Sequence, residues 1–279
     1  MSLIALVSEK GSPGTTTLGL TLAAVWPRRV ALVECDPAGG DLALRLVDST
    51  GRPFLHPEPG LLTLAAAVRS ESALPAASVW EHGQPFLGPA SAGSVVLAGL
   101  NSPEQATGLT GLWPALADAL AATDGGDVLA DLGRLHPGSP ALAVAQASEV
   151  LVGVARGTAE GMLRLRDRLG HVLGAPPPTK AERRVLVVLV ADDRRGHEAV
   201  TAMRTVLDRS GLAAAAVGFI AVDNRAVAGL QRGLRGGWLD RTLLMRSARA
   251  LVPKLCTAEV PPATASREPR RRAVLARSR

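Results

Sequence analysis

Apolar residues follow two alternating patterns along the chain. Short runs rich in Val, Leu and Ala are bounded by Gly, Pro or Asp, which is typical of buried strands in a parallel sheet. Longer segments between these runs place apolar residues at helical spacing. Strands are predicted near residues 2–7, 30–34, 94–98, 127–131, 149–154, 185–190 and 216–222, with a short edge strand at 86–89. Helices are predicted near residues 15–25, 60–68, 109–122, 158–173, 201–210, 225–233 and 239–255.

This alternation predicts an α/β domain with three layers, in which a mostly parallel, twisted sheet carries helices on both faces. The helix at 158–173 is amphipathic, and Arg164, Arg166 and Arg168 lie on its polar side. These arginines fit an ordinary solvated face, or alternatively a surface that meets a partner or DNA.

The folded domain is predicted to span residues 1–256, and a Pro- and Arg-rich basic tail follows at 257–279. The formal net charge of the chain is +6. Six arginines and one glutamate fall between Ser266 and Arg279, so most of this charge belongs to the tail. The composition predicts a disordered, solubilising tail, and electrostatic contact with DNA or anionic lipid is the alternative.

Composition limits the class of protein. Apolar residues make up 47% of the chain and aromatic residues only 3%, so the core must consist mainly of Ala, Val and Leu. Cys35 and Cys256 form neither a disulfide framework nor a metal-binding spacing. We see no signal peptide and no run long enough to span a membrane, so a cytoplasmic location is expected, with possible attachment to the nucleoid or membrane.

A glycine-rich loop follows the first predicted strand. Gly11 and Gly14 let the backbone turn and bring its N–H groups close to a phosphate. The next helix directs its positive end at the same point. Thr16 stands where its hydroxyl could bind magnesium. The alternative is an ordinary strand-to-helix turn, which also favours Gly, Ser and Pro.

Two aspartates follow predicted strands. Asp36 ends the second strand, where a carboxylate can hold a metal-bound water or orient an attacking one. Asp131 ends the strand at 127–131 and could bind magnesium through water. The alternative for Asp131 is a capping role at the strand end or at the next helix.

These segments together resemble the ParA/MinD ATPases, a family of P-loop NTPases. Residues 10–17 resemble the deviant Walker A loop Lys-Gly-Gly-x-Gly-Lys-Thr-Thr, residues 34–37 resemble Asp-x-Asp-Pro, and residues 127–133 resemble a Walker B strand. The resemblance implies catalytic roles for Lys10, acting across a nucleotide-sandwich dimer, and for Asp36. It implies magnesium ligation by Thr16 and Asp131. It also implies nucleotide binding by Gly11, Ser12, Pro13, Gly14, Thr15, Thr16 and Thr17, with Asp223 and Asn224 near the purine unless they simply cap the following helix.

The loop departs from the family pattern at two positions. Ser12 replaces a glycine, which is a mild change. Thr15 replaces the lysine that contacts the β- and γ-phosphates, and a neutral hydroxyl cannot supply that charge in phosphoryl transfer. Slow or absent ATP hydrolysis is therefore expected.

Two functions follow from the resemblance. The first is a nucleotide-dependent positioning or partitioning protein that binds ATP or ADP with Mg²⁺, forms a homodimer, meets a protein partner of unknown identity and uses its tail on DNA or membrane. The second is a non-catalytic scaffold that localises a pilus, secretion or cell-division assembly. Thr15 favours the scaffold, whereas Lys10, Thr16, Asp36 and Asp131 favour the nucleotide switch.

Overall fold

The computed structural model describes residues 2–9, 13–56, 58–70, 76–85, 93–173, 183–212 and 214–256. Three predictions fall outside these ranges: the loop residues Lys10, Gly11 and Ser12, the edge strand at 86–89, and the tail at 257–279.

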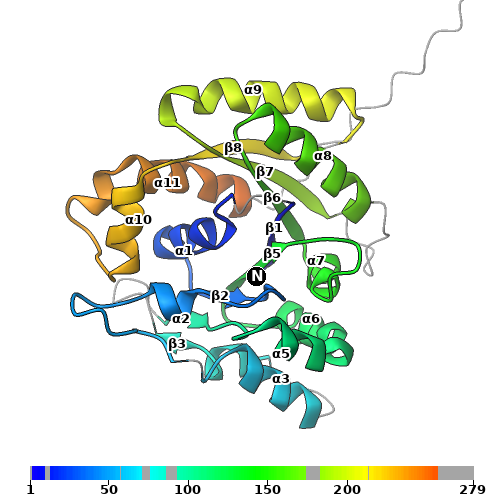
Figure 1. Ribbon diagram of the computed structural model, residues 1–279, viewed down its shortest axis with the longest axis vertical. Helices are drawn as coiled ribbons and strands as arrows, with labels where there is room; N and C mark the ends of the chain where they lie inside the picture. The colour runs from blue at the N-terminus through cyan, green and yellow to red at the C-terminus, as the bar shows by residue number, and fades with distance from the viewer. Residues whose placement is uncertain are drawn as a thin grey trace, which may run out of the picture.

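One eight-stranded sheet organises the described chain, in the order β3-β4-β2-β5-β1-β6-β7-β8 (Figure 1). Every neighbouring pair is parallel except β3 and β4, which are antiparallel. The strands are β1 Leu3–Ser8, β2 Val30–Glu34, β3 Gln84–Pro85, β4 Val95–Leu97, β5 Asp127–Arg134, β6 Val150–Arg156, β7 Arg184–Ala191 and β8 Ala216–Ala221. The predicted α/β fold is confirmed.

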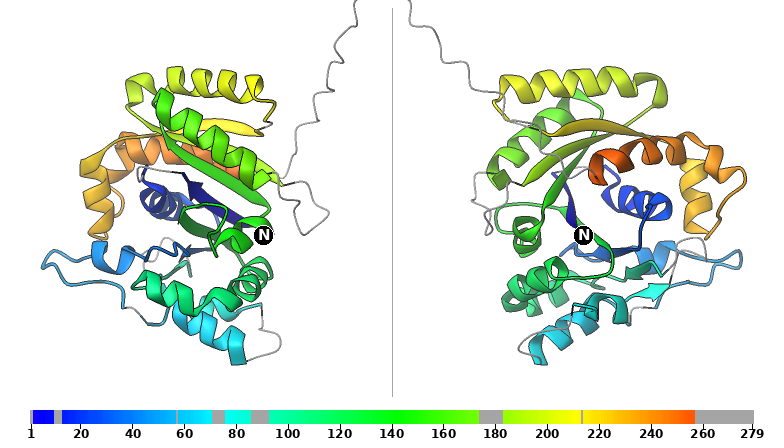
Figure 2. Two further views of the ribbon diagram at one scale, coloured as in Figure 1. Left: turned by 45° about the vertical axis from the view of Figure 1, so that its right-hand side comes forward. Right: turned by 180° about the vertical axis from the view of Figure 1, so that it is seen from behind.

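Helices cover both faces of this sheet (Figure 2). The helices are α1 Thr15–Val25, α2 Leu42–Arg45, α3 Leu61–Ser70, α4 Ser78–Glu81, α5 Pro103–Gly108, α6 Trp113–Ala121, α7 Leu142–Ala147, α8 Ala159–Leu173, α9 Asp193–Arg209, α10 Asn224–Gln231 and α11 Leu243–Cys256. Helices α1, α10 and α11 share one apolar cluster, whereas α3, α6, α7, α8 and α9 share another on the opposite face.

Alternating side chains of the central strands separate these two cores. In β1, Ile4 and Leu6 belong to the α1 side, whereas Leu3, Ala5 and Val7 belong to the α6 side. Because parallel strands covered on both faces need apolar residues at every position, the predicted strands read as continuous apolar runs.

The structure corrects three predicted boundaries. Helix α9 begins at Asp193 rather than near residue 201, because the Asp192 carboxylate caps it by accepting the N–H of Arg194 at 3.0 Å. The segment predicted as one helix over 109–122 divides into a 3₁₀ turn at Thr110–Leu112 and α6. Strand β5 continues to Arg134, beyond the predicted end at 131.

The amphipathic helix α8 has its arginines in ion pairs. Arg164 pairs with Glu160 on the same helix. Arg168 pairs with Glu9 at the end of β1, with 3.4 Å between nitrogen and oxygen. The exposed Arg164–Glu160 pair fits the solvated-face interpretation, whereas Arg168 and Glu9 are both mostly buried and join α8 to the end of β1. In the described ranges, no helix has the length and apolar character to cross a membrane.

Candidate functional site

The candidate site lies where β2, β5 and β1 end side by side. These three strands are neighbours and run parallel, so their carboxyl ends meet at one edge of the sheet. Within this edge Asp131 of β5 is in register with Glu34 of β2 and Leu6 of β1. The first turn of α1 follows the glycine-rich loop at the same edge, which brings Thr16 to the strand ends.

The described part of the glycine-rich loop ends in a left-handed turn. Gly14 has φ +101° and is the N-cap of α1, with its carbonyl accepting the N–H of Leu18 at 2.8 Å. Glycine suits this position because other residues rarely adopt positive φ. Gly14 has no side chain to cap the first turn, so the helix directs backbone N–H groups and its positive end outward.

Thr16 and Asp131 are brought into contact. The Thr16 hydroxyl lies near enough to the Asp131 carboxylate to lower its pKa, and the N–H of Gly133 donates a hydrogen bond to Asp131 Oδ1 at 3.0 Å. Asp131 is only 1% exposed. Burial raises the pKa of Asp131 to about 6, although Thr16 and the N–H of Gly133 act in the opposite direction. The two predicted metal ligands thus share one location.

Asp36 packs beside them. Its Oδ1 accepts the N–H of Ala38 at 2.8 Å, and its Oδ2 lies so close to Gly133 that an added Cβ there would be 1.7 Å away. Burial raises the pKa of Asp36 above its ordinary value. The negative charge of Asp36 in turn raises the pKa of Asp131. A bound cation would relieve this repulsion between two partly desolvated carboxylates.

The chemistry of this donor set fits magnesium. Mg²⁺ binds hard oxygen donors and uses one or two carboxylates together with substrate phosphates and water. Thr16, Asp36 and Asp131 supply a hydroxyl and two carboxylates at the end of a helix that favours phosphate. No cluster of three or more His, Cys, Asp or Glu suited to a metal occurs within the described ranges, so a site built by protein ligands alone is not indicated there.

Glu34 has a role that the sequence did not indicate. It is 2% exposed and accepts three backbone N–H groups: those of Asp41 and Leu42 on Oε1 at 2.9 and 3.0 Å, and that of Gly99 on Oε2 at 3.0 Å. Burial raises its pKa to about 7. Glu34 therefore fastens the acidic loop, residues 36–41, to the segment after β4. The sequence feature that could have indicated this role is Gly40. A side chain there would collide with Glu34, since an added Cβ would lie 2.6 Å from Glu34 Oε2.

Two described side chains near the site differ in charge. Thr15, at the position of the family lysine, is 6% exposed and offers no charge. Arg45, at the end of α2, forms an ion pair with Asp41 one turn earlier and lowers the pKa of Asp131. Sequence reasoning overlooked Arg45, because its electrostatic effect on Asp131 joins residues that are far apart in the chain.

The other predicted nucleotide-binding residues lie at different distances from this centre. Pro13 is buried before Gly14, and the carbonyl of Thr17 accepts the Thr21 hydroxyl at 2.6 Å inside α1. Asp223 and Asn224 follow β8, which β6 and β7 separate from β1. The Asp223 carboxylate accepts the N–H of Ala226 at 3.0 Å and caps α10, which agrees with the capping alternative. Their contact with a purine stays a prediction.

Comparison with solved structures places the fold among known ATPases. The chain is similar to a ParA family ATPase from Chlorobium tepidum TLS, with a TM-score of 0.64, 14% identity and coverage of 90% of this chain and 98% of that one. It is similar to MinD complexed with Mg-ADP from Pyrococcus horikoshii OT3 (TM-score 0.63, 19% identity, 91% and 96% covered). It is also similar to the Cyanothece McdA(D38A)–ATP complex (TM-score 0.61, 16% identity, 94% and 98% covered).

Two further similar structures contain partners. One is the MinC:MinD cell division protein complex of Aquifex aeolicus, with a TM-score of 0.61 and 12% identity over 94% of this chain and 98% of that one. The other is pNOB8 ParA bound to nonspecific DNA, with a TM-score of 0.55 and 14% identity over 91% and 97%. At these identities the similarity establishes the fold.

No protein-family model matches the sequence, and no curated protein matches it significantly. The similarity to solved ParA and MinD structures agrees with the resemblance of the two N-terminal loops. It does not assign a role to any single loop residue.

Proposed function

We propose that this chain binds a magnesium nucleotide at the N-terminus of α1 and works as a slow, nucleotide-dependent positioning protein of the ParA/MinD type. The contact between Thr16 and Asp131, with Asp36 packed against Gly133 beside them, carries the proposal. The solved structures of similar fold with Mg-ADP and with ATP support it.

Each group has a distinct task in this proposal. The backbone N–H groups from Gly14 into the first turn of α1 receive the phosphates. Thr16 and Asp131 would hold Mg²⁺, which would supply positive charge to the phosphates. Asp36 would orient the attacking water through its carboxylate. Lys10 lies outside the described residues, and its proposed role is to reach the nucleotide of the second copy in a homodimer.

Slow turnover follows from Thr15. Phosphoryl transfer depends on cations that stabilise charge on the transferred group, and this loop has a neutral, buried side chain where the family has lysine. We propose that nucleotide binding, rather than rapid hydrolysis, sets the state of the protein. That state would control contact with a protein partner, DNA or an anionic membrane, the last two through the basic tail.

The test is calorimetric titration of the full chain with magnesium-ATP and magnesium-ADP. We expect micromolar affinity that is abolished by Gly14→Val, because a β-branched residue strains the turn at φ +101°, and by Asp131→Ala, which removes the proposed metal ligand. Asp118→Ala on the exposed face of α6 is the matched control and should bind as the parent does. Absence of binding at millimolar nucleotide, in protein with an unchanged circular dichroism spectrum, would refute the proposal.

A non-catalytic scaffold is the second candidate, and the neutral Thr15 favours it. Thr15→Lys distinguishes the two functions, since a lysine restores the missing cation. If the site is otherwise intact, ATP affinity or turnover should rise several-fold over the parent, whereas Thr107→Lys on exposed α5 should change neither. A folded Thr15→Lys variant that binds and hydrolyses no better than the parent would favour the scaffold.

A further inference from the structure

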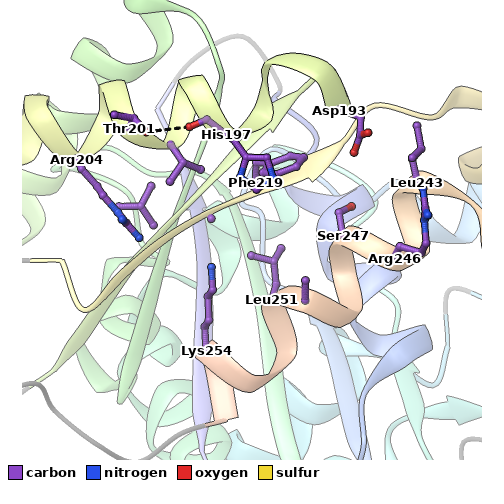
Figure 3. A pocket seen from close by; sticks show the side chains of 14 residues that line it. Asp193, His197, Thr201, Arg204, Phe219, Leu243, Arg246, Ser247, Leu251 and Lys254 are labelled. Carbon is purple, nitrogen blue, oxygen red and sulfur yellow. Dashed lines mark hydrogen bonds between the residues drawn. The ribbon is translucent and has the colours of Figure 1, made fainter.

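A groove follows the outer edge of the sheet, far from the candidate nucleotide site. Strand β8 is the last strand of the sheet and pairs with β7 alone among the described strands. Helices α9 and α11 pack on opposite faces of β8 and rise on either side of its free edge (Figure 3). The groove between them has a volume of about 520 Å³.

The floor of this groove is an unpaired strand edge. Val217, Gly218 and Phe219 of β8 line it. N–H direction alternates along a strand. The N–H of Val222 donates to Ala191 of β7 at 3.0 Å, so alternation along β8 turns the N–H groups of Val217 and Phe219 away from β7; that of Ala221 donates to the Ser247 hydroxyl at 3.0 Å. An exposed edge of this kind can accept a further strand.

Apolar side chains of both walls pack against the strand. Leu251 of α11 lies over Gly218, where an added Cβ would be 2.4 Å from Leu251 Cδ2. On the other wall the His197 ring meets the edge of Phe219 at a centroid distance of 5.2 Å. Both walls thus combine apolar side chains with an accessible strand edge, which is the arrangement that strand addition uses.

The charge of the groove is positive. Arg204 of α9 and Lys254 of α11 extend toward the strand from opposite walls, and Arg246 lines the groove further along α11 (Figure 3). None of these three is engaged in an ion pair with another described residue. Asp193 is the one carboxylate in the lining.

We infer that the β8 groove binds an extended acidic peptide segment of a partner protein as an added ninth strand. The free N–H and C=O groups of β8 would bind its backbone, and Arg204, Arg246 and Lys254 would bind its carboxylates. This inference is independent of nucleotide binding.

Charge separates this occupant from two others. A second copy of the chain, paired edge to edge, would bring Arg204, Arg246 and Lys254 against their own counterparts. The chain's own tail has six arginines and one glutamate from Ser266 onward, so it carries the same sign as the groove. An acidic strand is the occupant that complements both the edge and the charge.

The first experiment measures fluorescence anisotropy of a labelled peptide of alternating glutamate and threonine, added to the full chain. We expect saturable binding that weakens at least ten-fold in the double variant Arg246→Glu, Lys254→Glu. Arg209→Glu, at the exposed end of α9 outside the groove, is the control and should change affinity less than two-fold. Equal binding of the counterpart peptide with lysine in place of glutamate would overturn the inference.

The second experiment tests strand addition itself. Hydrogen exchange of the amides at 216–221 should slow when the acidic peptide is bound, and N-methylation of alternate peptide residues should abolish binding. If exchange is unchanged, or if the methylated peptide binds with full affinity, the peptide is held by charge alone and strand addition is refuted.

If the amides at 216–221 become protected as protein concentration rises, without peptide, the strand edge binds a second copy of the chain and the inference is wrong. If duplex DNA of equal charge displaces the peptide, Arg204, Arg246 and Lys254 bind DNA rather than an acidic peptide, and the inference is wrong.

Discussion

Gly133 has φ +56°, and its Cα lies directly against the carboxylate of Asp36. A side chain at this position would meet both an unfavourable backbone conformation and an atom at 1.7 Å. The same residue donates its N–H to Asp131. At the scale of single residues, one glycine thus allows two carboxylates to approach each other at the end of β5.

Gly133→Ala should therefore cost both stability and ligand binding. Positive φ costs a residue with a Cβ about 1–3 kcal/mol, and displacement of Asp36 adds to this. We expect a lower urea midpoint and a loss of magnesium-nucleotide affinity by calorimetry. Gly138→Ala is the control, since its nearest atom would be 3.6 Å away, and it should leave both quantities unchanged.

The buried acids of this edge should make stability depend on pH. Burial raises the folded-state pKa of Glu34 to about 7 and that of Asp131 to about 6, above their ordinary values. Between the ordinary and the raised pKa the folded state holds more protons than the unfolded state, so the free energy of unfolding falls as pH rises. Each pKa unit corresponds to about 1.4 kcal/mol, so the loss between about pH 4.5 and 7 should reach a few kcal/mol.

Urea unfolding at a series of pH values measures this effect. Glu34→Gln should flatten the fall in stability above pH 4.5, because glutamine does not titrate. Glu198→Gln on the exposed side of α9 should keep the slope of the parent. A parent protein whose stability rises from pH 5 to pH 7 would contradict the prediction.

At the scale of elements, the connection from α1 to β2 is fastened to β5 by one buried carboxylate. Asp127 is fully buried and accepts the indole N–H of Trp26 at 2.8 Å, the Nε and Nη2 of Arg28 at 2.9 and 2.6 Å, and the N–H of Ser2 at 3.0 Å. This cluster lies at the amino end of β5, opposite the candidate site.

Asp127→Ala should thus destabilise the fold without touching the site. Removal of one partner leaves Trp26 and Arg28 with unpaired donors, and losing half of a buried ion pair costs about 3–5 kcal/mol; the exposure of Arg28 reduces this to about 2–3 kcal/mol. The urea midpoint reports the loss. Nucleotide affinity measured below the unfolding transition should equal that of the parent, and a selective loss of affinity would show that α1 depends on this contact.

The helices and strands also show where sequence patterns are sufficient to predict secondary structure. The central strands and α1 were predicted closely, since continuous apolar runs and glycine punctuation are local signals. The first half of α9 was missed because its exposed face is charged and its cap at Asp192 resembles a loop. The break at Thr110–Leu112 was missed because helical spacing continues across it.

At the scale of the whole molecule, the ParA/MinD resemblance implies a nucleotide-dependent homodimer. With magnesium-ATP, light scattering should show the mass of the full chain doubling, because Lys10 of each copy would contact the nucleotide of the other. Lys10→Ala should remain monomeric while still binding nucleotide. Lys180→Ala is the matched control and should dimerise, and a parent that stays monomeric with saturating nucleotide would contradict the dimer.

Local patterns in the sequence were sufficient for the fold class, for most strands and helices along the chain, and for placing Thr16, Asp36 and Asp131 at strand or helix ends. Those features follow from periodicity, glycine and charge within short segments. Tertiary structure alone decided the order of strands across the sheet, and with it the packing of Asp36 on Gly133, the three N–H groups on Glu34 and the open groove at β8. Most of these contacts join residues far apart in the chain, such as Gly99 with Glu34 and Gly133 with Asp36. A local sequence pattern does not encode them, because the packing of other elements brings the two residues together.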